Sequence, residues 1–232
     1  MVKASFVIPS YNAAAWLAHA IDSAQKQTYP NLEIVVVDDA STDSTPELLA
    51  YLSERDRRIK VFRNETNLGR SASRNLGNEK ATGDILLVLD ADDIAYPDRA
   101  KLSVEKLKKV QFTYGSMDVM DCIGTKTGMN YADVFDKQRA IRTKLNFITH
   151  SSVAYTKEVA LKFPYKDGHF SSLGIDDWAQ QVDCASGGVP MDFIPQMVGA
   201  YRELSTGISK TRDGAKVDEV KTAYLESLKV AA

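Results

Sequence analysis

The first hundred residues alternate between short, largely apolar runs and longer stretches in which apolar positions recur with helical spacing. The runs cover residues 5–9, 32–37, 59–62 and 85–89. Between the first two runs, Leu17, Ile21 and Ala24 share one helical face. Apolar runs of this length are typical of strands buried on both faces of a parallel sheet, whose crossovers are helices. The pattern therefore predicts an α/β fold with a Rossmann-like, mostly parallel central sheet flanked by helices.

Capping residues mark where the predicted helices begin. Asn12 is expected to cap the first helix, and Thr45 to cap the second, with Pro46 at its first helical position. The third helix is expected to lie within residues 67–81 and to end before Thr82-Gly83.

Beyond Arg99 the pattern is looser. It predicts helices over 97–109 and 157–163, and strands over 112–116 and 148–155. Residues 121–147 are polar and lack clear periodicity, so we expect loop and helix there. The tail is expected to be an amphipathic helix with Val217, Val220, Tyr224 and Leu228 on one face. Packing of this face on its own domain is preferred over a partner or a membrane surface.

Acidic residues follow two of the predicted strands. Asp38 and Asp39 come after the second run, and Asp90, Asp92 and Asp93 come at the end of the run 85–89. Ligands of open α/β sheets bind outside the carboxyl ends of the strands, so these acids are expected at a binding site. Asp-x-Asp alone is a weak signal because loops favour Asp, but three acids within four residues repel one another unless a cation lies among them. Hard oxygen ligands of this kind suit Mg²⁺ or Mn²⁺.

Composition narrows the class of partner. The chain has 232 residues, 29 of them basic and 31 acidic, so its net charge of −2 gives no overall basic field for nucleic acid or an anionic membrane. Cys122 and Cys184 lack metal-ligand spacing, no run approaches the ~20 apolar residues of a transmembrane helix, and the start does not resemble a signal peptide. A cytoplasmic location is therefore the default expectation. Neither a phosphate loop nor a Gly-x-Gly-x-x-Gly turn is present, so a diphosphate would depend on metal and basic side chains.

Five segments in order carry a family resemblance. They are residues 7–12, 37–43, 67–77, 81–84 and 89–93. Together they resemble the successive signatures of family-2 glycosyltransferases, which have the GT-A fold, and the strong match covers roughly residues 2–99. The resemblance implies transfer of a sugar from a nucleotide diphosphate donor, usually UDP-linked, to a glycan or other hydroxyl-bearing acceptor, with inversion at the anomeric carbon. We expect one domain over 1–232, with a nucleotide-binding half (1–99), an acceptor-binding half (100–210) and a C-terminal helix (211–232).

The same resemblance implies roles for individual residues. The expected nucleotide-binding residues are Pro9, Tyr11, Asn12, Asp39, Arg70, Arg74, Asp90 and Asp92. Tyr11 would stack on the base and Asp39 would accept a hydrogen bond from a ring N–H, whereas Asp38 is expected to be structural. Arg70 and Arg74 lie on one helical face and reach either the diphosphate or an aspartate, two alternatives that the sequence leaves open.

The metal is expected on Asp92 and Asp93. Alternation along an extended segment would place Asp90 and Asp92 on one side and Asp93 on the other, and the division of ribose and metal contacts among them stays open. Where many relatives have a Tyr-Arg-x-His run, this chain has Leu204 at the His position, so water or diphosphate oxygens would complete the metal shell.

Residues 174–178 resemble a Gly-x-Glu-Asp-Trp segment, with Asp176 in place of Glu. Acceptor activation requires a carboxylate within hydrogen-bond reach, and Asp177 is the first choice for this general base, with Asp176 second. Helix capping is the structural alternative for both. For His150, a satisfied histidine without catalytic duty is preferred over the alternative of a contact with the acceptor.

Three functions remain in competition. The first is a metal-dependent inverting glycosyltransferase. The others are a nucleotidyltransferase and a non-catalytic protein of the same fold that binds sugar nucleotides or glycans. Assembly with a second copy of the chain is left open.

Overall fold

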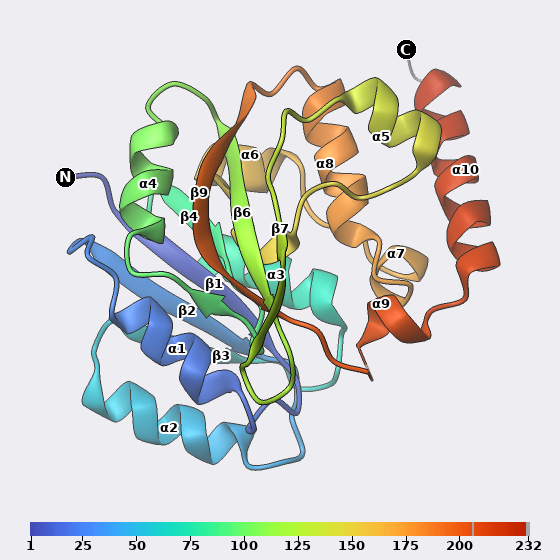
Figure 1. Ribbon diagram of the computed structural model, residues 1–232. Helices are drawn as coiled ribbons and strands as arrows, with labels where there is room; N and C mark the ends of the chain where they lie inside the picture. The colour runs from blue at the N-terminus through green and yellow to red at the C-terminus, as the bar shows by residue number, and fades with distance from the viewer. Residues whose placement is uncertain (206, 231–232) are drawn as a thin grey trace.

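The computed structural model describes residues 1–205 and 207–230. Over these ranges nine strands form one mixed sheet in the order β3-β2-β1-β4-β8-β6-β9-β5, and β7 pairs with β6 (Figure 1). The strands are β1 (Ala4–Ser10), β2 (Leu32–Asp38), β3 (Ile59–Arg63), β4 (Ile85–Val88), β5 (Ile94–Ala95), β6 (Phe112–Met120), β7 (Lys126–Asn130), β8 (Ala154–Thr156) and β9 (Met191–Arg202). The α-helices are α1 (Leu17–Gln25), α2 (Thr45–Arg55), α3 (Arg70–Lys80), α4 (Arg99–Lys106), α5 (Lys137–Thr143), α6 (Lys157–Lys162), α7 (His169–Ser172), α8 (Asp176–Ser186), α9 (Ile208–Thr211) and α10 (Gly214–Val230), and η1 (His150–Ser152) is a 3-10 helix.

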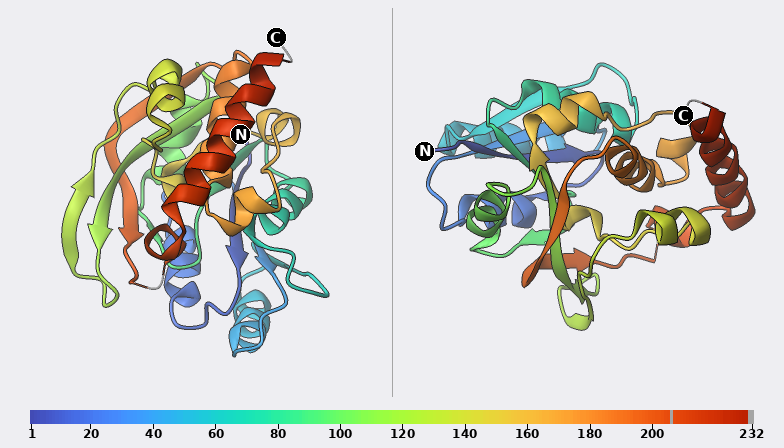
Figure 2. Two further views of the ribbon diagram at one scale, coloured as in Figure 1. Left: turned by 90° about the vertical axis from the view of Figure 1, so that its right-hand side faces the viewer. Right: turned by 90° about the horizontal axis from the view of Figure 1, so that it is seen from above.

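The N-terminal half is the parallel part of the sheet. Strands β3, β2, β1 and β4 run in the same direction, with Val7 of β1 opposite Val35 of β2 and Val88 of β4. Successive side chains enter different cores: Phe6 and Ile8 pack with α1 and α4, whereas Val7 and Val35 face the opposite layer, on the side of α3 and α6 (Figure 2). Burial on both faces explains why these strands are apolar at nearly every position.

Helix α3 lies close to the sheet because of Gly77. A Cβ atom at this position would come within 2.5 Å of Val7 Cγ1 and 3.4 Å of Val37 Cγ2. This close approach fixes the position of the α3 N-terminus at the carboxyl ends of β1 and β2.

The C-terminal half departs from a parallel sheet. Strand β8 is antiparallel to both β4 and β6, while β9 is parallel to β6 and antiparallel to β5. The predicted parallel arrangement therefore holds for β1 to β4 and for the pair β6 and β9, while β5, β7 and β8 are paired antiparallel. Strand β9 was not predicted at all, since its polar positions and internal Pro195 interrupt the apolar pattern.

Several predicted boundaries are corrected by the structure, two of them through side-chain hydrogen bonds. Helix α1 begins at Leu17 rather than after Asn12, because the Asn12 side-chain oxygen accepts the backbone N–H groups of Thr42 and Asp43 and joins two loops instead. Helix α2 is preceded by Ser44, one residue before the predicted cap. The predicted strand 148–155 is replaced by η1 followed by β8, and helix α4 is shorter than predicted. Around η1, Ser152 donates to the Thr149 carbonyl, the kind of local bond that competes with a strand.

Helix α10 packs on its own domain, as predicted. Tyr224 contacts the rings of Phe170 and Trp178 in T-shaped geometry, with centroids at 5.2 and 6.2 Å, and Leu228 joins the same cluster. Val217 packs against Leu173 and Ile175. No helix within the described ranges combines the length and apolar character that crossing a membrane requires.

Candidate active site

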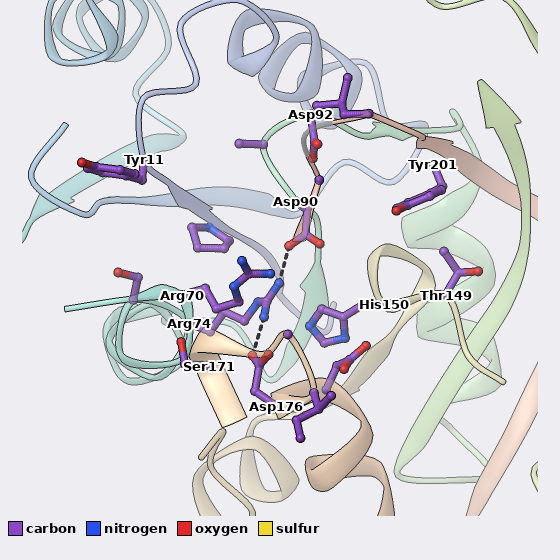
Figure 3. Close-up of a pocket in the computed structure, with 18 of the residues that line it drawn as sticks. Tyr11, Arg70, Arg74, Asp90, Asp92, Thr149, His150, Ser171, Asp176 and Tyr201 are labelled. Atoms are coloured by element: carbon purple, nitrogen blue, oxygen red, sulfur yellow. Dashed lines mark hydrogen bonds and ion pairs between the residues drawn. The ribbon is translucent and has the colours of Figure 1, made fainter. Parts of the chain in front are cut away.

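One large cavity opens at the carboxyl ends of the parallel strands. Its volume is about 1210 Å³, and it is lined from segments as distant in sequence as the loop after β1 and helix α10. All of the nucleotide-binding residues expected from the sequence line it, together with Asp176 and Asp177. Figure 3 shows the centre of this cavity, with Tyr11 at one side and Asp92 and Tyr201 at the other. The location is the one that an open α/β sheet provides for ligands.

Arg74 connects two aspartates of the site through its guanidinium. Its guanidinium donates through Nη1 to Asp176 Oδ2 at 2.6 Å and through Nη2 to Asp90 Oδ1 at 2.7 Å (Figure 3). Burial opposes charge on this 5% exposed residue, yet Asp90 and Asp176 raise the pKa of Arg74 well above its ordinary value. The partner charge likewise outweighs burial at Asp90, where Arg74 lowers the pKa to about 2. Of the two roles left open by the sequence, Arg74 therefore takes the ion pair with aspartates.

Arg70 lies one turn earlier in α3 and lines the same cavity (Figure 3). Within residues 1–205 and 207–230 no salt bridge engages its guanidinium. An arginine fork without a protein carboxylate partner is suited to a phosphate.

Asp39 lines the cavity, and three hydrogen bonds fix the orientation of its carboxylate. Its Oδ1 accepts from Asn64 Nδ2 at 2.7 Å and Leu68 N at 2.9 Å, and its Oδ2 accepts from Gly69 N at 2.8 Å. Asp38 points elsewhere: it accepts from Ser41 N at 3.1 Å and pairs with the Arg63 guanidinium. The contrast matches the predicted division between a cavity-lining Asp39 and a structural Asp38.

Tyr11 and Pro9 line the cavity beside Asp39. The Tyr11 side chain is 50% exposed, which leaves its ring face accessible to a planar ligand. Asn12 also lines the cavity, although its side-chain oxygen is occupied by the loop after β2.

The structure separates the two acids expected to hold a metal. Asp93 is fully buried, does not line the cavity, and its Oδ1 accepts from Arg202 N at 2.7 Å. Burial, with the charges of Asp92 and Asp90, raises the pKa of Asp93 well above its ordinary value. The expectation that Asp93 shares the metal is therefore corrected: its carboxyl group has no access to a ligand in the cavity. The expected alternation does not apply to this segment, because Ala91 and Asp92 form a turn and Ala91 lines the cavity along with Asp90 and Asp92.

Asp92 alone of that pair faces the cavity (Figure 3). Burial and the neighbouring Asp90 raise the pKa of Asp92 to about 6, and the charges of Arg202 and Arg70 offset this only in part. A divalent cation supplies the remaining compensation, so the donor set fits Mg²⁺ or Mn²⁺. No group of three or more His, Cys, Asp or Glu side chains in the described residues is arranged to hold a metal. The fit is therefore that of a metal bound by one or two carboxylates together with ligand phosphates.

Asp176 and Asp177 occupy different environments in the first turn of α8. Asp176 is 1% exposed and its carboxylate is committed to Arg74. Asp177 is partly exposed to the cavity, and it accepts from Asn146 Nδ2 at 2.5 Å and from Trp178 N at 2.7 Å. Burial, followed by the charge of Asp176, raises the pKa of Asp177 to about 6. A carboxylate poised near neutral pH and open to a cavity has the properties of a general base.

Comparison with known proteins assigns the family. Residues 5–163 match the family model described as "Glycosyl transferase family 2". The chain belongs to this family. Family membership confirms the resemblance read from the five sequence segments and favours a glycosyltransferase over a nucleotidyltransferase.

Two curated relatives illustrate the extent of the similarity. An uncharacterized glycosyltransferase of Haemophilus influenzae is 35% identical over 124 residues, which are 53% of this chain and 50% of the relative. The succinoglycan biosynthesis protein ExoO of Rhizobium meliloti is 35% identical over 127 residues, which are 54% of this chain and 36% of the relative. The matched segment thus spans half or less of the length of these relatives.

Solved glycosyltransferase structures share the fold of this family member. S. aureus TarS 1-349 in complex with UDP-GlcNAc has a TM-score of 0.68 at 18% identity, covering 96% of this chain and 66% of that one. The mannosyltransferase PcManGT from Pyrobaculum calidifontis, in complex with GDP-Man and Mn²⁺, has a TM-score of 0.68 at 20% identity, covering 89% and 59%. The α/β prediction and its GT-A form are confirmed.

Three further residues belong to this part of the family-2 site: His150, which the sequence singled out, and Arg202 and Asn146, which it did not. His150 lines the cavity and is only partly satisfied, because its Nδ1 has no hydrogen-bond partner among the described residues. His150 is 8% exposed, with Nε2 3.2 Å from Tyr165 Oη, and burial lowers its pKa to about 3, so it is neutral. Arg202 donates to the backbone carbonyl of Asp92 at 2.9 Å and holds the acidic loop. Asn146 lies in the segment without periodicity, where no pattern distinguishes it.

Lys221 lines the cavity from α10. A signal for it exists in the sequence, because Lys221 lies four residues after Val217 and three before Tyr224, on the apolar stripe of the tail helix. A lysine within the buried apolar face of a helix is unusual and indicates that its charge has a specific role.

Proposed function

We propose that this chain transfers a sugar from a UDP-linked donor to an acceptor hydroxyl, with inversion at the anomeric carbon and with a divalent metal. The observation that carries the proposal is the convergence of Asp39, Arg70, Asp92 and Asp177 on one cavity in a family-2 chain. TarS has been solved with UDP and UDP-GlcNAc, and PcManGT with GDP-Man and Mn²⁺, which supports a nucleotide-sugar donor and a metal for the shared fold.

The donor is assigned to the N-terminal half, residues 1–99. The Tyr11 ring stacks on the uracil, and Asp39, its carboxylate oriented by three donors, accepts the ring N–H. The diphosphate lies against Arg70, whose fork carries its negative charge. Asp92, together with the diphosphate, would hold Mn²⁺ or Mg²⁺, which would supply Lewis-acid stabilisation of the leaving group.

The acceptor is assigned to the second half, residues 100–210, with Asp177 as the base. Its carboxylate takes the proton from the acceptor hydroxyl as that oxygen attacks the anomeric carbon on the face opposite the diphosphate. The bond from the anomeric carbon to the phosphate oxygen breaks, and its electron pair leaves with UDP. Asn146 orients the Asp177 carboxylate, while Arg74 keeps the adjacent Asp176 paired.

Leu204, at the position of the family His, favours one alternative: a protein that binds sugar nucleotides without transferring the sugar. Calorimetric titration with UDP, GDP, dTDP and CDP, each with and without Mn²⁺, tests the shared binding step. We expect UDP to bind best and only weakly without metal; equal affinity with and without Mn²⁺ contradicts the metal site. Product analysis with a panel of UDP-sugars then separates the two functions, because binding without turnover supports the alternative.

A further inference from the structure

Helix α10 carries a buried cation into the acceptor end of the cavity. Lys221 is only 3% exposed, and its side chain lines the cavity together with Asp177. The helix lies beyond residues 5–163, the part of the chain that matches the family model. Figure 2 shows α10 lying along the outside of α8, and Tyr224 and Leu228 anchor it there.

The Lys221 ammonium makes one hydrogen bond and one ring contact within the described residues. Its Nζ donates to the backbone carbonyl of Lys144 at 2.5 Å and lies 4.5 Å from the centre of the Trp178 ring. It takes part in none of the salt bridges of the described residues. An ammonium has three N–H donors, and a buried charge without a bonded carboxylate is costly to the fold. An anionic ligand in the cavity would accept the remaining N–H bonds of the Lys221 ammonium and offset the cost of burying its charge.

The charge is present at neutral pH. Burial lowers the pKa of Lys221 to about 8, while Asp177 acts in the opposite direction. Arg212, which lines the same end of the cavity, donates to the Gly174 carbonyl at 2.9 Å and leaves the rest of its guanidinium exposed. Asp218 also acts on Lys221 from within α10. Two cations thus share the wall of the cavity at which Asp177 is placed.

We propose that Lys221, assisted by Arg212, forms a subsite for an anionic group on the acceptor, so that the preferred acceptor bears a carboxylate or a phosphate near its reacting hydroxyl. The inference rests on the proposed function, because Asp177 identifies this end of the cavity as the acceptor end. The anion completes the ammonium's hydrogen bonds and at the same time holds the hydroxyl beside Asp177. Specificity for the charged acceptor then comes from the tail helix rather than from the segment shared with the family.

The test compares matched pairs of small acceptors that differ in charge. Methyl β-D-glucuronide is paired with methyl β-D-glucoside, and glycerol 3-phosphate with glycerol, and binding to the full chain is measured by calorimetry or saturation-transfer NMR with and without UDP and Mn²⁺. Within at least one pair, the anionic member is expected to bind about tenfold or more tightly, the increment of a charge-assisted hydrogen bond. The pair that responds distinguishes a carboxylate from a phosphate.

Variants connect this preference to Lys221. Lys221→Met keeps the stem against Trp178 and removes the charge, so it should abolish the preference, while Lys221→Arg should retain most of it. Lys216→Met, at an exposed position of the same helix, is the control and should change nothing. UDP affinity and thermal unfolding are measured on every variant, so that a loss of folding is not mistaken for a loss of the subsite.

The outcomes are distinguishable. Equal binding of charged and neutral members, binding of neither, or an unchanged preference in Lys221→Met overturns the subsite even when UDP binds normally. Lys221→Met that weakens UDP rather than the acceptor also overturns it, because the ammonium would then belong to the donor. Failure of wild-type protein to bind UDP counts against the proposed function instead.

Discussion

Replacing Asp177 by Asn should reduce transfer without affecting donor binding. The amide keeps the size of the carboxyl group and a partner for Asn146, but it cannot take a proton from the acceptor. Loss of a general base costs about 10²–10⁴-fold in rate. The loss should appear in the chemical step, measured by single-turnover transfer, with UDP affinity nearly unchanged.

The pH profile adds a second measure of the same role. With a pKa of about 6, Asp177 is roughly 90% ionised at pH 7 and roughly 10% ionised at pH 5, so wild-type transfer should fall about tenfold between them. The fall reflects protonation of the base, and the Asp177→Asn variant should lack this step. Asp92 also has a pKa of about 6, so both profiles are recorded at saturating UDP-sugar and Mn²⁺, where Asp92 is expected to hold the metal. Full activity of the variant, or an equal pH step in both proteins under these conditions, would refute the assignment.

The choice of control follows from the structure. Asp176→Asn would be a poor control, because it removes one of the two carboxylates that bind the buried Arg74. Asp22→Asn is better matched: it removes the same charge at an exposed position far from the cavity, and it should leave both the rate and the pH profile unchanged.

Asp92→Asn should abolish most of the gain in UDP affinity that Mn²⁺ confers, as measured by calorimetry; a gain equal to that of wild type would remove Asp92 from the metal site. Arg74→Met should lower the free energy of unfolding at pH 7 by about 3–5 kcal/mol, because it leaves the buried carboxylate of Asp176 and the partly buried carboxylate of Asp90 unpaired. Since Arg74 lowers the pKa of Asp90 to about 2, the stabilisation from this pair is present above the unfolded pKa of about 4 and is lost as pH falls towards 2. Urea titrations across that range should show the two proteins converging, and a difference that does not depend on pH would contradict the ion-pair explanation. Gly77→Ala should destabilise the fold by about 1–3 kcal/mol by forcing α3 away from Val7, and a neutral effect in the same urea assay would show that the helix has room to move.

The N-terminal half of the fold was predictable from the sequence because each of its strands is buried on both faces. Phe6 and Val7 are adjacent and enter opposite cores, so an apolar run carries an unambiguous signal there. The second half lacks that signal. In β9, burial varies along the strand and Pro195 interrupts the apolar pattern. At η1, the Ser152 hydroxyl bonds to the Thr149 carbonyl instead of allowing the strand to continue.

The site residues divide in the same way, into those of the N-terminal half, whose positions the sequence predicts, and those of the second half, whose positions it does not. The position of the acids at one edge of the sheet was predictable because the topology of a parallel sheet fixes where the strand ends lie. The burial of Asp93 was not, because it depends on Arg202, 109 residues later in the chain. Asn146 and Lys221 come from segments whose positions only tertiary packing decides. The helix that carries Lys221 was predicted, but the direction of that side chain was not.

The ion pairs of Arg74 have a thermodynamic consequence for the order of binding. One guanidinium is shared between Asp90, at the end of β4, and Asp176, beside the proposed base. A ligand that draws on Asp90 leaves more of that positive charge to Asp176, and so alters the field felt by Asp177. Because coupling between two equilibrium binding sites is reciprocal, any factor by which the donor changes acceptor affinity must equal the factor by which the acceptor changes donor affinity. Arg74 thus physically connects the two ends of the cavity, and any coupling carried by this guanidinium would appear equally in donor and acceptor affinity.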